Sequence, residues 1–362
     1  MKRALIAVVL ISLLSIGLLA DETIFLRSNL NWYFGPYKLK QAQAILGRDK
    51  HLTTIVQKQN SPLEALLTQS GYKKTRLCLT GSGLYEMPVR CGDRDAYFLV
   101  DSGAGNYLIF QSLIDSWNLA TTKTSTSIGE MTLVSLHNFG FGVDPTERAL
   151  VIPNKHTKFR PNDPDLLPDR WEAFGIIGSP FIKTTKAIMD CSSGSLFLHD
   201  PDKSLADRIG LDSLMKTNGY QSIEMRWNDE RKKWFLPISM DGNKWDGCVD
   251  TGSSVTCIDA ALAGKLGTEI PGTSSPLRGA THDDAKDRTW RVSIREFKLG
   301  AFTTCFPYIN VISSPGGHNK PGVELGNDIL LTHCAVIDFG RNKLYLKHPD
   351  KGHAEQRPER DK

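Results

Sequence analysis

Short apolar runs separated by turn-forming residues dominate the chain from Cys78 onward. Tyr97–Val100, Leu196–Leu198 and Leu344–Leu346 are such runs, and Gly, Pro, Asp and Asn lie between them. Strands joined by tight turns give this pattern, whereas an amphipathic helix repeats its apolar positions about every three to four residues. The pattern therefore predicts an all-β fold for this part of the chain.

Residues 21–76 have a different pattern, which is more polar and favours helix. Ser61 is a good N-cap, Pro62 suits the first helical turn, and Gly71 suits the end of a helix. One apolar face follows the cap and consists of three leucines, Leu63, Leu66 and Leu67. We expect a short helical N-terminal segment here, acting as a spacer, a pro-like segment or a cover on the following domain.

The N-terminus has the charge order of an export signal. Lys2 and Arg3 precede an apolar run over residues 4–20, and Asp21 follows it. The run is long enough for a signal peptide and short for a membrane span. Cleavage after Gly17 fits the preference for small residues, and an uncleaved anchor that tethers the protein to a membrane is the alternative. In both cases we expect an exported protein, either membrane-anchored or secreted and periplasmic.

Composition narrows the class of protein. The 362 residues are 40% hydrophobic and 23% charged, which is typical of a globular chain long enough for two lobes. The net charge is +4, and lysines and arginines are scattered without a basic run, so we expect no nucleic-acid partner. Seven cysteines are present, none in a CxxC pair, and export would permit disulfides whose connectivity the sequence leaves open.

An internal repeat is the most informative feature of the sequence. DSGA at residues 101–104 is echoed by DTGS at residues 250–253. Each motif is followed by an apolar segment that ends in glycine, FGIIG in the first half and VELG in the second. The spacing from Asp to that Gly is 77 residues in the first half and 76 in the second, and a further Asp follows 12 residues later in both. A single Asp-Ser-Gly is common in turns, but two copies with matched partners indicate a duplicated domain.

A third matched pair lies within the repeat. VSLHNFGFG at residues 134–142 has the apolar and polar order of VSIREFKLG at residues 292–300. The loop before this segment is longer in the second half, and the loop after it is longer in the first half. Surface loops commonly vary in length in this way around a constant sheet. We expect the loops at Thr121–Met131 and Thr268–Arg291 to be flaps over a cleft between the two motifs.

With these motifs the chain resembles the aspartic proteases of the pepsin and retropepsin clan, over about residues 83–348. The resemblance implies two homologous β-barrel-like lobes in one chain, the bilobal acid protease fold of pepsin-like enzymes. It implies that Asp101 and Asp250 are the catalytic pair. Seven further residues match the family's active-site loop support: Ser102, Gly103, Thr251, Gly252, Ser253, Gly178 and Gly326.

The repeat and the resemblance together predict the domain organisation. Six segments are expected: a leader or anchor at 1–20, a helical spacer at 21–76, an N-terminal lobe at 77–201, a linker at 202–221, a C-terminal lobe at 222–348 and a polar tail at 349–362. Because one chain carries both motifs, we expect a monomeric catalytic unit.

Paired carboxylates suit amide hydrolysis by water. Two carboxyl groups a few ångströms apart cannot both ionise cheaply, so they share a proton and supply one base and one acid. This chemistry needs no metal and no cofactor, and the sequence contains neither HExxH nor GxSxG. The expected activity is that of an aspartic endopeptidase, with a peptide or protein as its substrate.

Some positions depart from the pepsin-like pattern. Tyr107 to Ile109 occupy the region where a tryptophan is usual, Ala104 lacks a hydroxyl, and Glu324 stands where an apolar residue is usual. These departures leave an alternative open, a catalytically inactive peptide-binding or envelope scaffold protein on the same fold.

Overall fold

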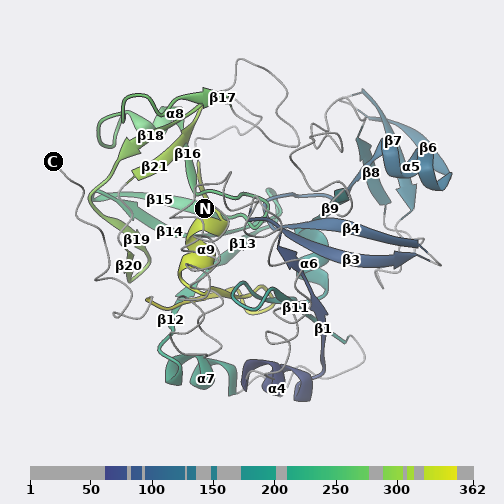
Figure 1. Ribbon diagram of the computed structural model, residues 1–362, viewed down its shortest axis with the longest axis horizontal. Helices are drawn as coiled ribbons and strands as arrows, with labels where there is room; N and C mark the ends of the chain where they lie inside the picture. The colour runs from purple at the N-terminus through teal and green to yellow at the C-terminus, as the bar shows by residue number, and fades with distance from the viewer. Residues whose placement is uncertain are drawn as a thin grey trace, which may run out of the picture. The chain divides into compact units, whose positions relative to one another are not determined.

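The protein is mostly β-sheet wherever its structure is described. The computed structural model describes residues 62–79, 83–91, 94–126, 129–135, 148–152, 173–200, 210–276, 288–304, 308–313 and 322–348. The strands of these residues form sheets of eight, ten and six strands (Figure 1), which confirms the all-β prediction for the described residues. The expected leader or anchor, most of the expected spacer and the polar tail lie outside them.

The eight-stranded sheet contains the first Asp motif. Its strands, in spatial order, are β2 (Cys78–Leu79), β3 (Tyr85–Cys91), β4 (Arg94–Asp101), β9 (Ala173–Gly178), β5 (Leu108–Phe110), β8 (Arg148–Ile152), β7 (Gly129–Ser135) and β6 (Thr121–Thr126). The helix α5 (Gln111–Trp117) directly follows β5 and buries Leu113 and Ile114. Its left-handed C-cap, Asn118, turns the chain towards β6.

The ten-stranded sheet contains the second Asp motif. Its strands, in spatial order, are β17 (Ser275–Pro276), β18 (Arg288–Ser293), β21 (Tyr308–Ile312), β16 (Cys257–Asp259), β22 (Val323–Leu325), β15 (Asn243–Val249), β14 (Lys233–Met240), β19 (Phe297–Leu299) and β20 (Phe302–Thr304), with β13 (Arg226–Asn228) beside β14. The short helix α8 (Ala260–Ala263) follows β16 as α5 follows β5.

Strand pairing repeats between these two sheets. In the first sheet, β9 is parallel to β4 and antiparallel to β5, and β5 is parallel to β8. In the second sheet, β22 is parallel to β15 and antiparallel to β16, and β16 is parallel to β21. The matched spacing in the sequence thus corresponds to a matched order of strands. Within the described residues each sheet has open edges, so the expected barrel-like closure is not seen.

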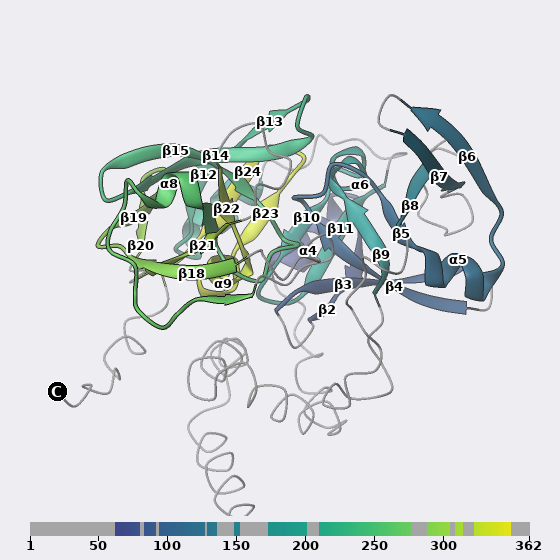
Figure 2. The ribbon, with the colours of Figure 1, turned by 90° about the horizontal axis from the view of Figure 1, so that it is seen from above.

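The six-stranded sheet joins the two halves of the repeat. Its strands, in spatial order, are β1 (Tyr72–Arg76), β11 (Ser195–His199), β10 (Ile188–Asp190), β23 (Val336–Asp338), β24 (Lys343–Leu346) and β12 (Gln221–Glu224). β10 from the first half pairs with β23 from the second, with Met189 opposite Ile337. Figure 2 shows β10 and β23 near the middle of the view, with the ten-stranded sheet on one side and the eight-stranded sheet on the other.

Two helices cover the six-stranded sheet, α4 (Pro62–Gln69) and α7 (Leu211–Thr217), and Figure 1 shows them next to each other. Leu67 of α4 and Leu211 of α7 belong to one buried apolar cluster with Phe197 and Tyr345 of the sheet. The helix predicted from Pro62 is therefore confirmed. The structure differs from the sequence prediction in the residues that follow, because Tyr72–Arg76 form strand β1, paired with β11, where a helical spacer was expected.

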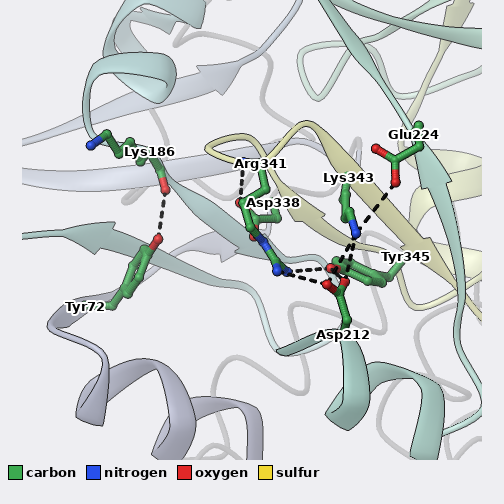
Figure 3. Close-up of polar contacts among 8 residues, drawn as sticks. All are labelled: Tyr72, Lys186, Asp212, Glu224, Asp338, Arg341, Lys343 and Tyr345. Atoms are coloured by element: carbon green, nitrogen blue, oxygen red, sulfur yellow. Dashed lines mark hydrogen bonds and ion pairs between the residues drawn. The ribbon is translucent and has the colours of Figure 1, made fainter. Parts of the chain in front are cut away.

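A polar network fixes α7 on the sheet (Figure 3). The Asp212 carboxylate of α7 accepts hydrogen bonds from Tyr345 Oη at 2.5 Å and from Arg341 Nη1 at 3.1 Å, and Lys343 Nζ lies 3.2 Å from it. Arg341 also donates to Asp338, which is fully buried, at 2.7 Å. Burial opposes ionisation of Asp212, but the hydrogen bonds from Tyr345 and Lys343 lower its pKa overall. The acidic and basic groups of this network pair with one another, so we infer that the network has a structural role.

The two expected flaps each contain a β-hairpin. β6 pairs with β7, and β17 pairs with β18, in antiparallel register. The tips, residues 127–128 and 277–287, lie outside the described residues, so closure over a cleft stays a prediction. Among the described helices, none has the length and apolar character needed to cross a bilayer.

Candidate active site

The two motif aspartates lie at equivalent places in the two larger sheets. Asp101 is the last residue of β4, and Asp250 directly follows β15. A tight turn follows each of them, closed by a hydrogen bond from Ala104 N to Asp101 O at 3.3 Å and from Ser253 N to Asp250 O at 3.2 Å. The preceding residues are buried and apolar, so each strand ends in the interior and presents its carboxylate there.

The structure brings the two carboxyl groups together. A Cβ atom added at Gly103 would collide with the carboxylate of Asp250, and one added at Gly252 would collide with the carboxylate of Asp101. Each carboxylate therefore lies against the glycine of the opposite loop, and a side-chain hydrogen bond links the two. Only glycine leaves room for this approach, which explains why both motifs place it after the hydroxyl residue.

The hydroxyl residues of the motifs brace the two loops against each other. Ser102 N donates to Thr251 Oγ1 at 3.0 Å, and Thr251 N donates to Ser102 Oγ at 3.1 Å. Each hydroxyl in turn donates across to the other half, Ser102 Oγ to Val249 O at 2.7 Å and Thr251 Oγ1 to Val100 O at 2.8 Å. Both residues are fully buried, so these four bonds are shielded from competing water.

Backbone amides orient the carboxylates. Asp101 Oδ1 accepts hydrogen bonds from Gly103 N at 2.8 Å and from Ala104 N at 2.9 Å. Asp250 Oδ1 accepts one from Gly252 N at 2.9 Å. Ser253, included among the support residues by resemblance, donates its hydroxyl to Val255 O at 2.8 Å, within its own loop.

Gly178 and Gly326 lie where the neighbouring strand passes each motif loop. A Cβ at Gly178 would collide with the carbonyls of Asn106 and Ala104, and one at Gly326 would collide with the backbone of Val255. Both are in extended conformation, so close packing rather than an unusual φ requires glycine here. The next residues fix the crossing through matched hydrogen bonds, Ser179 N to Ala104 O at 2.8 Å and Asn327 N to Ser253 O at 2.9 Å.

The electrostatics of the pair favour one shared proton. Asp250 is 8% exposed, and Asp101 is partly exposed. Burial raises the pKa of Asp101 well above its usual range, and the charge of Asp250 and the hydrogen bond with it raise this pKa further. Lys233 opposes this rise in pKa. Because two buried carboxyl groups this close cannot both ionise cheaply, the arrangement favours a pair that shares one proton and one negative charge.

The sequence interpretation missed several residues that contact or support the pair. The buried Asn327 donates from Nδ2 to Thr251 O at 2.8 Å, and Asp328 accepts from Thr256 N at 2.8 Å and from Thr256 Oγ1 at 2.6 Å. Lys233 at the start of β14 also acts on both aspartates. Aligning the two halves residue by residue would have indicated Lys233, since it takes the place of an apolar Leu84.

The described part of the chain contains no group of three or more His, Cys, Asp or Glu side chains placed to hold a metal ion. Cys78, Cys191, Cys248 and Cys257 form no disulfide.

Comparison with known proteins supports a protease-like domain in the second half. Residues 236–329 match the family model described as aspartyl protease. This span contains the Asp250 motif and Gly326 and excludes Asp101. No curated protein matches the sequence.

Three solved structures show low similarity to the chain. Conglutin gamma, a basic 7S globulin from lupine seeds, is 10% identical with a TM-score of 0.42, over 77% of this chain and 95% of that one. Basic 7S globulin from soybean is 10% identical with a TM-score of 0.39, over 76% and 95%. A retropepsin-like aspartic protease from Rickettsia conorii is 18% identical with a TM-score of 0.26, over 36% and 91%.

Thr251→Val tests the brace between the loops. Valine keeps the shape of threonine but removes the hydroxyl, which leaves Ser102 N without its acceptor and Val100 O without its donor. Each unpaired buried group costs about 1–3 kcal/mol, so we expect a lower free energy of unfolding. Denaturant titration measures the effect. Thr251→Ser keeps the hydroxyl and is the matched control, and equal losses in both variants would contradict a role for the hydrogen bonds.

Proposed function

We propose that the protein is an exported aspartic endopeptidase with Asp101 and Asp250 as its catalytic pair. One observation carries the proposal: each carboxylate lies against the glycine of the opposite motif loop, and four buried hydrogen bonds hold the loops together. A purely structural turn would need neither the facing carboxylates nor the cost of burying them.

The proposed reaction uses the pair as one base and one acid. The ionised member of the Asp101–Asp250 pair takes a proton from a water molecule between the carboxyl groups as the water oxygen attacks the peptide carbonyl carbon. The protonated member donates to the carbonyl oxygen, and a tetrahedral diol results. The first member then donates its proton to the amide nitrogen as the C–N bond breaks, while the second takes a proton from a diol hydroxyl. Both residues return to their starting states, as a catalyst requires.

This mechanism sets the pH dependence. A doubly protonated pair lacks the base, and a doubly ionised pair lacks the acid. We therefore expect a bell-shaped dependence of kcat/KM on pH whose two limbs belong to the pair as a unit.

The proposed architecture is the single-chain bilobal form, with lobes at 77–201 and 222–348 and a linker at 202–221. The repeated strand pairing of the two larger sheets supports it. One chain supplies both aspartates, so the proposed catalytic unit is a monomer that takes a peptide or protein substrate. The apolar run at residues 4–20 supports export, with a cleaved signal and a membrane anchor as its two forms.

Peptide hydrolysis tests the proposal directly. Purified protein incubated with a peptide library at mildly acidic pH is expected to cleave peptides, and a hydroxyl-containing mimic of the diol such as pepstatin is expected to inhibit cleavage. Mass spectrometry of the products measures both. Peptide binding without cleavage at any pH would favour the alternative of a binding protein. The absence of both binding and cleavage would contradict the proposal.

A further inference from the structure

The two halves of the repeat differ in one cluster beside the catalytic pair. In the first half, Leu84, Leu99 and Ile176 form a small buried apolar cluster, with Leu108 packed against it. Leu99 stands opposite Ile176 on β9, and so does Leu108. The members of this cluster are all apolar.

The equivalent positions of the second half are polar. Lys233 precedes Asp250 by the same 17 residues as Leu84 precedes Asp101, and Glu324 precedes Gly326 by two residues as Ile176 precedes Gly178. Cys248 and Cys257 take the places of Leu99 and Leu108.

Strand register places Cys248, Cys257 and Glu324 side by side. Cys248 on β15 and Cys257 on β16 both stand opposite Glu324 on β22, and Cys257 Sγ lies 3.6 Å from Glu324 Oε2. Lys233 begins β14 two residues before Phe235, which stands opposite Cys248, so Lys233 lies beside the end of β15 that leads to Asp250. We call Lys233, Cys248, Cys257 and Glu324 the polar cluster.

The charges of the polar cluster depend on pH. Burial raises the pKa of both cysteine thiols well above the usual range, so the thiols stay neutral. Burial, and then the charge of Asp250, raise the pKa of Glu324 to about 7, so this carboxyl group is neutral in mildly acidic solution. Burial disfavours the Lys233 cation, but the acidic groups around it raise its pKa overall, and it stays charged.

Lys233 provides a counter-charge for the catalytic pair. In mildly acidic solution the catalytic pair carries one negative charge, and Lys233 is the cation of the polar cluster. A buried anion is costly unless a counter-charge lies nearby, and the apolar cluster of the first half supplies none. The cation approaches the pair from the Asp250 side, because β14 pairs with β15.

We propose that Lys233 is a positioning residue for the catalytic pair: its ammonium group stabilises the negative charge that the two aspartates share. Glu324, once ionised, opposes this stabilisation. This inference rests on the proposed function. Lys233 thereby lowers the pH at which the pair loses its first proton and becomes singly ionised. When Glu324 ionises, its negative charge opposes the loss of the last proton from the pair.

Other charged groups surround the polar cluster and enter the same balance. They are Asp101 at the end of β4, Asp250 after β15, Asp259 at the end of β16 and Asp328 in α9 (Asn327–Thr332). Arg226 and Arg231 of the β13–β14 hairpin lie over the ring of Phe235, at 5.4 and 5.7 Å from its centre, and Phe235 stands opposite Cys248. None of these groups is altered by the substitutions below.

Lys233→Met is expected to shift both limbs of the pH profile of kcat/KM upward by about one pH unit, because losing a nearby cation disfavours both ionisations of the pair. Lys233→Arg keeps the charge, so both limbs of its pH profile are expected to lie close to those of the wild type. Lys244→Met, on exposed β15 surface, is the control and should leave both limbs in place. Glu324→Gln should lower the alkaline limb and leave the acid limb unchanged, since Glu324 is neutral there.

A second measurement separates this inference from the proposed function. Carbon-13 labelling of aspartate Cγ allows the titration of the pair to be followed by NMR without any hydrolysis. Lys233→Met, or Lys233→Gln if the methionine variant does not fold, is expected to raise the titration midpoints of the pair. Unchanged midpoints in a folded variant would overturn the role of Lys233. An inactive wild-type protein whose pair still responds to Lys233 would contradict the protease proposal alone.

Discussion

Asp250→Asn and Asp101→Asn are each expected to lower kcat/KM by at least about a thousandfold, since removing one member of a catalytic unit disables the whole unit. Asparagine keeps the shape of aspartate but cannot ionise. Either variant leaves a single carboxyl group, so the pair can no longer supply a base and an acid together.

Stability separates loss of chemistry from loss of fold. Both variants relieve the repulsion between two buried carboxyl groups, so we expect their free energy of unfolding to equal or exceed that of the wild type. Asp246→Asn is the matched control, because Asp246 lies on the same strand β15 with its side chain exposed. Near-normal kcat/KM in either Asp101→Asn or Asp250→Asn would rule out a two-aspartate mechanism.

Gly326→Ala is expected to destabilise the protein by about 2–3 kcal/mol and to reduce activity strongly, because over-packing a tight site forces the backbone to move. The added methyl group would meet the backbone of Val255, which cannot rotate away. The displaced loop carries Asp250, so the geometry of the pair changes with it. Gly178→Ala is expected to act in the same way through the carbonyls of Ala104 and Asn106.

Gly264→Ala is the control for this prediction. Gly264 follows α8 in right-handed helical conformation, and a Cβ there would meet nothing within 4 Å. Alanine should be neutral or slightly stabilising at that position. Denaturant unfolding of the three variants measures the effect, and equal stability of Gly326→Ala and Gly264→Ala would show that the crossing of β22 under the Asp250 loop is not tightly packed.

The sequence by itself predicted the strand-rich fold and the helix from Pro62. These predictions succeeded because they depend on local order, the alternation of apolar runs with turn residues and the capping of a helix. The repeat also identified the candidate pair, since two copies of one motif at equal spacing imply two copies of one arrangement of strands. The observed pairing of β4 with β9 and of β15 with β22 agrees with that spacing.

Only the tertiary structure decided how these parts meet. Residues 72–76 became strand β1 because β11, more than a hundred residues later, offers an unpaired edge, which no local pattern reveals. The facing of Asp101 and Asp250, and the hydrogen bonds between Ser102 and Thr251, join residues about 150 positions apart. The sequence marked Glu324 as unusual, but its nearness to Lys233 and Asp250 emerges only when three strands align. The charge of a side chain can be read from the sequence. The electrostatic field at a buried pair depends on every charged group that the fold brings near it.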